Sequence, residues 1–183
     1  MKGGAQLKLS HNIPSVYTLP SRYDFIKGQL IVMEGNIEIG ENCEIQSFVK
    51  ISDKVKIGNN VTIKEYTRID KGAQIGDNVQ VRGGSVICED TIIEGDNDLG
   101  HSLICTNHPK LNKFHGVDIK QPPMIKRFAR IGTTVTLMPG VVIGKNSIVG
   151  AGTLVNKSIP DYEVWMGSPC KFYRKINEDE IVK

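Results

Sequence analysis

Aliphatic residues recur along this chain at every sixth position. In blocks of six, the first residue is Leu, Ile or Val in seventeen blocks, which run from Ile39 to Leu99 and again from Ile125 to Val155. The fifth position is mostly small or β-branched, as at Cys43, Val49, Val55, Val61, Thr67, Ala73, Val79, Ser85 and Thr91. A period of six fits neither an α-helix nor an ordinary β-meander with turns every 8–12 residues.

The repeat instead predicts a coil of short flat strands, each followed by a corner. First-position aliphatic side chains would point inward and stack on their equivalents one coil away, while the small fifth-position residues would fill a tapering interior. Gly, Asn and Asp supply the backbone freedom that sharp corners need. The sequence therefore indicates an all-β solenoid, whose repeats bury their apolar side only by stacking.

The pattern resembles the hexapeptide-repeat acyltransferases, and the resemblance covers residues 37–175. It implies a left-handed parallel β-helix, shaped as a triangular prism with three hexapeptides per coil. The handedness enters through the resemblance, because parallel crossovers are normally right-handed. The resemblance also implies a homotrimer with its sites at subunit interfaces.

The same pattern divides the chain into three parts. Residues 1–36 form an N-terminal cap segment, 37–160 the β-helix with an inserted loop at 105–123, and 161–183 a C-terminal strand and helix cap. The stretch SRYDFIKGQL predicts a short irregular or helical cap, and the segment from Lys171 predicts a short amphipathic helix over the open end. Caps are expected because the last coil would otherwise expose a strand edge.

Charge is distributed unevenly over a net value of +3. Residues 1–100 hold 11 Lys/Arg and 14 Asp/Glu, whereas residues 101–183 hold 12 and 6, so the second half is net +6. A basic half suits a polyanion. Aromatic residues that would stack on single-stranded nucleic acid are sparse, so a phosphorylated small molecule is expected and no nucleic acid.

Other compositional signals exclude several classes. No apolar run approaches the ~20 residues of a membrane span, and the N-terminus lacks a secretory signal, so we expect a cytoplasmic protein without a membrane span. The four cysteines form no CxxC pair, which predicts free buried thiols.

The six-residue register breaks in the segment CTNHPKLNKFHGVDIKQPP, residues 105–123. An insertion at a solenoid corner projects outward and often carries function. His108, followed by Pro109, resembles the catalytic histidine in the loop of sugar O-acetyltransferases of this family. A histidine suits removal of the acceptor proton near neutral pH. The alternative is a solvated loop histidine.

The residues around His108 also resemble a second branch, which N-acetylates amino sugars on nucleotide carriers. Thr106 and Asn107 coincide with that branch's Thr-Asn, whereas His108 replaces its Asp and His101 its Pro. The resemblance implies N-acetylation of a nucleotide-linked amino sugar in surface polysaccharide synthesis. O-acetylation of a sugar hydroxyl and a non-catalytic assembly subunit remain alternatives.

Two further polar residues have two interpretations each. Asn107 is predicted to bind the acceptor or the developing oxyanion, or else to stabilise the loop. His101 is a second base candidate or a buried structural histidine. His115 is expected to be a loop residue, and three histidines spaced like these do not match the metal ligands of the γ-type carbonic anhydrases. No metal is therefore expected.

The stretch from Ala129 to Lys171 resembles the acetyl-CoA-binding coils of the family. The resemblance implies that acetyl-CoA is the cosubstrate and that its pantetheine arm lies along a solenoid edge. Small residues permit that close approach, which nominates Gly132, Gly150 and Ala151. Cations suit the phosphates, which nominates Lys157, Lys171 and Arg174. Alternatively, the glycines only turn corners and the cations are only solvated.

Overall fold

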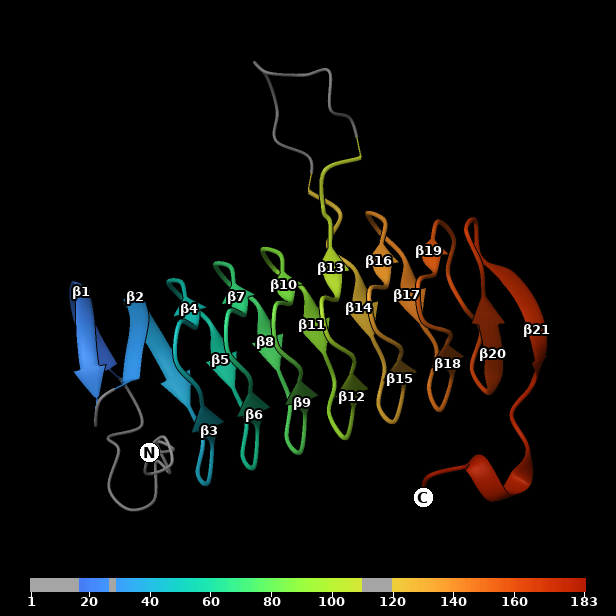
Figure 1. Ribbon diagram of the computed structural model, residues 1–183, viewed down its shortest axis with the longest axis horizontal. Coiled ribbons are helices and arrows are strands. Elements are labelled where there is room, and N and C mark those ends of the chain that lie inside the picture. Colours follow the sequence, from blue (N-terminus) through green and yellow to red (C-terminus); the bar gives the residue numbers. More distant parts are fainter. Residues whose placement is uncertain (1–16, 27–28, 110–119) are drawn as a thin grey trace, which may run out of the picture.

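The computed structural model describes residues 17–26, 29–109 and 120–183. Short strands follow one another around a triangular prism. From β3 (Glu44–Ile45) to β16 (Thr136–Leu137), each strand pairs in parallel with the strand three elements later, as β4 (Lys50–Ile51) does with β7 (Arg68–Ile69). Figure 1 shows the coils stacked along one axis, with β1 (Tyr17–Ile26) and β2 (Gln29–Ile39) at one end and β20 (Glu163–Met166) and β21 (Lys171–Lys175) at the other. The fold matches the predicted left-handed parallel β-helix.

The strands form three faces, A, B and C, and the chain passes around the prism in the repeating order A, B, C. Face A contains β3 (Glu44–Ile45), β6 (Thr62–Ile63), β9 (Gln80–Val81), β12 (Asp98–Leu99), β15 (Arg130–Ile131), β18 (Ile148–Val149), β20 (Glu163–Met166) and β21 (Lys171–Lys175). Face B contains part of β2 (Gln29–Ile39), then β4, β7, β10 (Val86–Ile87), β13 (Ile104–Cys105), β16 (Thr136–Leu137) and β19 (Leu154–Val155). Face C contains the rest of β2, β5 (Lys56–Ile57), β8 (Gln74–Ile75), β11 (Ile92–Ile93), β14 (Met124–Ile125) and β17 (Val142–Ile143).

The core is the set of inward columns that the repeat predicts. All first-position residues from Ile45 to Val155 are buried, and Ile39 at the end is partly buried. The fifth-position residues named above are buried as well. Burying an aliphatic side chain stabilises a fold by roughly 1.5–3 kcal/mol, so these columns dominate the stability of the prism.

Many residues at the corners adopt left-handed backbone conformations. The C–A corner carries a ladder of such residues, Asn42, Asn60, Asn78 and Asp96, whose φ values lie between 52° and 57°. Their side chains bond from coil to coil, with Asn60 Nδ2 donating to Asn78 Oδ1 at 3.1 Å and Asn78 Nδ2 donating to Asp96 Oδ1 at 2.8 Å. Asn tolerates this conformation better than most residues, which explains the recurrence of Asn here.

The N-terminal cap is a β-hairpin, so the prediction of an irregular or helical cap was wrong. β1 (Tyr17–Ile26) pairs antiparallel with β2, and β2 already belongs to the solenoid, since Val32 pairs with Lys50 and Glu38 with Lys56. The open edge of the first coil needs hydrogen-bond partners, which a strand supplies and a helix does not. Residues 1–16 and 27–28 of the predicted cap lie outside the described residues.

The C-terminal cap is also mostly strand. Lys171–Lys175 forms β21, antiparallel to β20, where the sequence predicted a helix from Lys171. The only helix among the described residues is the single 3-10 turn Glu178–Glu180. Pairing along the edge of β20 satisfies more backbone groups than a helix at this place would, since β20 otherwise ends face A.

The insertion interrupts the prism at the B–C corner. On face A, Gln80 pairs with Asp98 and Asp98 pairs with Arg130, so the coil from Asp98 to Arg130 is much longer than the regular coil before it. Cys105 lies on β13 and is buried, because a small apolar side chain can fill the inward position. The regular rung therefore continues past the predicted start at Cys105.

Two other predictions concern the whole chain. Cys43, Cys88, Cys105 and Cys170 are free and buried, which confirms the cysteine prediction. Among the residues that the structure describes, no helix is long and apolar enough to cross a membrane.

Candidate functional site

His108 lies where the chain leaves the prism at the B–C corner. It is exposed, and it follows Asn107, which is buried with 6% of its surface accessible. The Asn107 carbonyl accepts a hydrogen bond of 2.8 Å from the amide of Gln121, and the side-chain Nδ2 donates to the carbonyl of Glu89 at 3.4 Å. His108 is thus attached directly to a fixed point of the solenoid.

A cavity of about 590 Å³ opens beside His108 over face B. It is lined by Arg68, Asp70, Cys88, Glu89, Cys105, Thr106, Asn107 and His108. A volume of this size is typical of small-molecule sites, which usually occupy roughly 300–1,000 Å³. The predicted base His108 and its neighbour Asn107 therefore share one cavity.

Burial sets the chemistry of the two cysteines in this cavity. Desolvation raises the pKa of the Cys105 thiol far above its ordinary value. Desolvation also raises the pKa of Cys88, and the charge of Asp70 raises it further. Because the thiolate is the nucleophilic form, both thiols are poor nucleophiles. His108 is the histidine of this lining, and histidine is a residue type suited to acid–base work near neutral pH.

His101 lies at the A–B corner, across face B from the corner that carries His108. It follows β12 and is exposed, where the structural interpretation of the sequence expected a buried histidine. Its backbone carbonyl accepts a 2.7 Å hydrogen bond from the amide of Thr134 on the next coil. His101 is not among the residues that line the cavity beside His108.

The small residues predicted for the cofactor lie on one line along the A–B corner. A Cβ on Gly132 would stand 2.5 Å from the backbone nitrogen of Ala151, and one on Gly100 would stand 2.5 Å from the Gly132 carbonyl carbon. A Cβ on Gly150 would stand 2.8 Å from the Cβ of Met166. Successive coils therefore approach closely here, and Gly132, Gly150 and Ala151 form a continuous edge with little side chain.

The three predicted phosphate ligands lie in three different settings. Lys171 is exposed and pairs with Met166, so it continues the glycine edge. Lys157 lies beyond β19 at the B–C corner, and its Nζ is 5.0 Å from the ring centroid of Trp165. Arg174 forms a two-point ion pair with Glu180, at 2.6 and 2.8 Å. Lys171 is therefore the cation best placed to extend the edge.

Trp165 covers the end of the core. It pairs with Val149, packs against the core cluster, and donates from Nε1 to Glu163 Oε2 at 2.7 Å. Glu163 is buried with 8% of its surface accessible and also pairs with Lys175. Hydrogen bonds from Lys175 and Trp165 lower the pKa of Glu163. This network fixes the C-terminal cap against the core.

No group of three or more His, Cys, Asp or Glu residues within the described ranges is arranged to hold a metal ion. His115, the third of the evenly spaced histidines, lies outside those ranges.

Sequence reasoning missed the face B side of the cavity. Arg68, Asp70, Cys88 and Glu89 occupy ordinary outward or corner positions of the repeat, and nothing in their spacing separates them from other such positions. The one available signal in the sequence was that Asp70 and Cys88 precede Thr106, near His108, by whole coils of the repeat. Asp70 follows β7 and Cys88 follows β10, the two strands of face B that precede β13 in the stack, so they lie two coils and one coil away from Thr106 in the same column.

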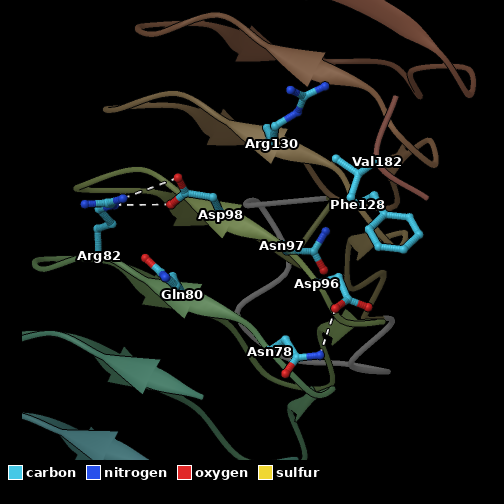
Figure 2. A pocket seen from close by; sticks show the side chains of 9 residues that line it. All are labelled: Asn78, Gln80, Arg82, Asp96, Asn97, Asp98, Phe128, Arg130 and Val182. Carbon is cyan, nitrogen blue, oxygen red and sulfur yellow. Dashed lines mark hydrogen bonds and ion pairs between the residues drawn. The ribbon is translucent and has the colours of Figure 1, made fainter. Parts of the chain in front are cut away.

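A second cavity, of about 450 Å³, lies on face A near the C–A corner. Figure 2 shows its polar lining, with Arg82 turned toward Asp98 and Asn78 toward Asp96. The Arg82 and Asp98 side chains pair at 3.2 and 3.3 Å. None of the predicted site residues lines this cavity.

The repeat matches a known family, described as bacterial transferase hexapeptide (six repeats), at residues 36–71 and 122–157. The galactoside O-acetyltransferase of Lactococcus lactis subsp. lactis (strain IL1403) is 44% identical over 73 residues, 40% of this chain and 35% of that protein. The mitochondrial gamma carbonic anhydrase 2 of Arabidopsis thaliana is 40% identical over 91 residues, 48% of this chain and 27% of that protein. The chain thus spans less than half the length of these curated relatives.

Among solved structures, a variant of perosamine N-acetyltransferase from Caulobacter crescentus in complex with CoA and GDP-perosamine is similar. The identity is 26%, the TM-score is 0.59, and the likeness covers 72% of this chain and 56% of that one. The chain therefore contains the bacterial transferase hexapeptide repeat at residues 36–71 and 122–157, and its solenoid is similar to those of the acetyltransferases that share this repeat.

Proposed function

We propose that the protein is an acetyltransferase that moves an acetyl group from acetyl-CoA to a sugar. The observation that carries the proposal is the placement of His108 in the lining of a 590 Å³ cavity, on a backbone fixed by Asn107. The galactoside O-acetyltransferase and perosamine N-acetyltransferase relatives support the sugar acceptor. We place the reaction in the cytoplasm, where acetyl-CoA is available.

His108 acts as the general base in this proposal. Its imidazole removes the proton from the acceptor O–H or N–H while that oxygen or nitrogen attacks the thioester carbonyl. A bond forms from the acceptor atom to the acetyl carbon, and the carbon–sulfur bond breaks. The proton then passes from His108 to the departing CoA thiolate, so the enzyme returns to its starting state.

The glycine edge at the A–B corner is the proposed binding line for acetyl-CoA. Amides of the pantetheine arm can pair with backbone groups where Gly132, Gly150 and Ala151 leave the backbone accessible. Lys171 lies at the end of this line and suits the phosphates. Lys157 is held over Trp165 and Arg174 is paired with Glu180, so both would have to exchange partners before they bound a phosphate.

The two halves of the proposed site lie on different corners of one chain, so we propose a homotrimer in which they meet between subunits. Outward positions on faces B and C support this. Near the N-terminal end they are polar, as Lys50, Arg68, Lys56 and Gln74. Around the insertion they are mostly aliphatic, as Val86, Ile104 and Leu154 on face B, with Thr136 between the last two, and Ile92, Met124 and Val142 on face C. These half-buried aliphatic columns suit contact with a second copy.

The acceptor is either a nucleotide-linked amino sugar, N-acetylated in surface polysaccharide synthesis, or a sugar that is O-acetylated. The charges beside His108 favour the hydroxyl acceptor. Arg68 pairs with Asp70 and Lys120 pairs with Glu89, so each described cation of this region already has a carboxylate partner. A nucleotide diphosphate would meet both carboxylates unless its phosphates lay outside this cavity.

Two measurements test the proposal. Calorimetric titration with CoA should show saturable binding, which a non-catalytic assembly subunit would not need. A screen with acetyl-CoA, thiol detection and a panel of sugars and nucleotide amino sugars should show acceptor-dependent thiol release. Absence of CoA binding together with absence of thiol release would refute the proposed activity.

A further inference from the structure

The face B side of the cavity contains a column of three residues that occupy the same position in successive coils. Asp70, Cys88 and Thr106 each follow an inward residue of successive coils, and their backbones join the ladder, with the Asp70 amide bonding the Ile87 carbonyl at 2.9 Å. Neighbouring strands lie about 4.8 Å apart, so Asp70 is about 10 Å from Thr106 along the column. The column therefore leads from the His108 rung to a carboxylate two coils away.

Arg68 fixes this carboxylate. Its Nε lies 3.0 Å from Asp70 Oδ1 and its Nη2 lies 3.1 Å from Oδ2. The Asp70 side chain is 22% exposed, whereas that of Arg68 is 54% exposed. A carboxylate has about four lone-pair positions, and Arg68 uses two of them. Asp70 can thus still accept hydrogen bonds from a ligand. Because Arg68 already holds the carboxylate in one orientation, binding a ligand there costs little further side-chain entropy.

Between Asp70 and Thr106, Cys88 leaves a recess. Cys88 is buried, and its Sγ lies 3.2 Å from Thr91 Oγ1, so the thiol is directed into the protein. The raised pKa of Cys88 keeps it neutral and is caused partly by Asp70, which places the carboxylate beside the recess. A ring-sized ligand could occupy the recess with one end at Asp70 and the other at His108.

The charge balance of the lining limits what that ligand can be. Its carboxylates are Asp70 and Glu89. Arg68, which also lines the cavity, pairs with Asp70, and Lys120, which does not line it, pairs with Glu89. A fixed carboxylate with open lone pairs accepts hydrogen bonds from neutral hydroxyl groups and repels phosphates. The lining thus suits an uncharged polyol.

We propose that Asp70, held by Arg68, is the acceptor-recognition residue of this protein and that it binds hydroxyl groups of an uncharged hexopyranoside. Another hydroxyl of the same ring then lies at His108, where it is acetylated. This inference rests on the proposed function for the acetyl transfer, but the binding of the sugar at Asp70 is a separate claim.

The test compares Asp70→Asn with the same substitution in a similar ion pair outside the cavity. Arg82 and Asp98 form the same kind of ion pair on face A, outside the His108 cavity, so Asp98→Asn is the control. With methyl β-D-galactopyranoside and other methyl hexopyranosides as acceptors, Asp70→Asn should raise the acceptor KM about ten-fold or more, because a site built around a hydroxyl partner discriminates strongly. The KM for acetyl-CoA and the melting temperature should stay close to wild type, and Asp98→Asn should change neither KM.

Two further measurements separate the inference from the proposed function. Galactose 6-phosphate should be a poorer acceptor than the neutral glycoside in the wild-type protein and should recover in Asp70→Asn. Ligand-observed NMR with methyl β-D-galactopyranoside reports binding without turnover, so a protein that releases no thiol still decides the Asp70 claim. An unchanged acceptor KM and unchanged sugar binding in folded Asp70→Asn would overturn the inference.

Discussion

The backbone amide of Gln121 donates a hydrogen bond of 2.8 Å to the carbonyl of Asn107, which joins the two ends of the insertion at the prism surface. The amide of Gly140, one coil further on, donates to the Gln121 carbonyl at 2.7 Å. His108 is therefore the first residue beyond a clamp that is part of the solenoid ladder. This rigid backbone attachment limits how far the imidazole can move relative to face B, and proton transfer requires such a fixed position.

Asn107→Ala tests whether Asn107 acts as an anchor or contacts the reacting atoms. Its side chain is buried and donates to the Glu89 carbonyl, so its loss should lower the free energy of unfolding by roughly 1–2 kcal/mol. Turnover should fall together with stability, as measured by denaturant titration and steady-state kinetics. A large loss of turnover at unchanged stability would contradict the anchor and favour an oxyanion ligand.

Gly132→Ala tests the close approach of coils at the A–B corner. The new Cβ would stand 2.5 Å from the Ala151 nitrogen, so the backbone must shift, and the expected loss of stability is roughly 1–3 kcal/mol. Because the proposed acetyl-CoA line follows this edge, the KM for acetyl-CoA should rise as well. Thr133→Ala, an exposed neighbour at the same corner, is the control and should stay within about 0.5 kcal/mol of wild type.

Substitutions of Asn60 test the ladder at the C–A corner. Asn60 has a φ of 56°, and its side chain bonds both Asn42 and Asn78. Asn60→Gly removes the side-chain bonds but keeps the backbone conformation accessible, whereas Asn60→Ala also adds the left-handed strain of about 1 kcal/mol. The Asn60→Ala variant should therefore unfold at a lower temperature than the Asn60→Gly variant, whereas at positions with negative φ alanine is normally the more stable of the two. Equal or greater stability of Ala would contradict the ladder's conformational role.

Glu180 makes the C-terminal cap sensitive to acid. The hydrogen bond from Arg174, together with the Asn177 amide, lowers the pKa of Glu180 from 4.5 to about 2. A carboxyl with a lowered folded pKa contributes stability above its unfolded pKa and loses it as the pH falls toward the folded pKa. The stability difference between wild type and Glu180→Gln should thus be constant above about pH 5 and shrink between pH 4.5 and pH 2.

Glu178→Gln, in the same exposed turn, is the control for that experiment. Its difference from wild type should show no comparable fall over the same pH interval, as followed by urea midpoints. A pH-independent difference for Glu180→Gln would contradict the role of the Arg174 pair.

The inward columns could be predicted from the sequence because each coil repeats the same local rule. Ile45 is buried for the same reason as Ile131, so the periodicity alone locates both. The ends of the prism could not be predicted in this way. Tyr17–Ile26 and Lys171–Lys175 are strands because an open sheet edge needs partners, a requirement set by the rest of the fold and not by their own composition.

In the candidate site, too, some residues could be predicted from the local repeat and others depend on the three-dimensional stacking of the coils. His108 could be singled out because it interrupts the repeat, whereas Asp70 is an ordinary outward residue whose relevance depends on the stacking of coils. The separation of His101 and His108 onto two corners also depends on the coil geometry, since the short stretch that joins them is one face of the prism, with β13 at its centre.

The central claim is that His108 removes the acceptor proton, and His108→Ala against His101→Ala tests it most directly. Both variants remove an exposed histidine, but only His108 lines the cavity. The account predicts that His108→Ala lowers kcat on the order of 10²-fold or more while CoA binding by calorimetry is retained, and that His101→Ala lowers kcat by less than about ten-fold. Unchanged turnover in His108→Ala, or a larger loss in His101→Ala, would contradict it.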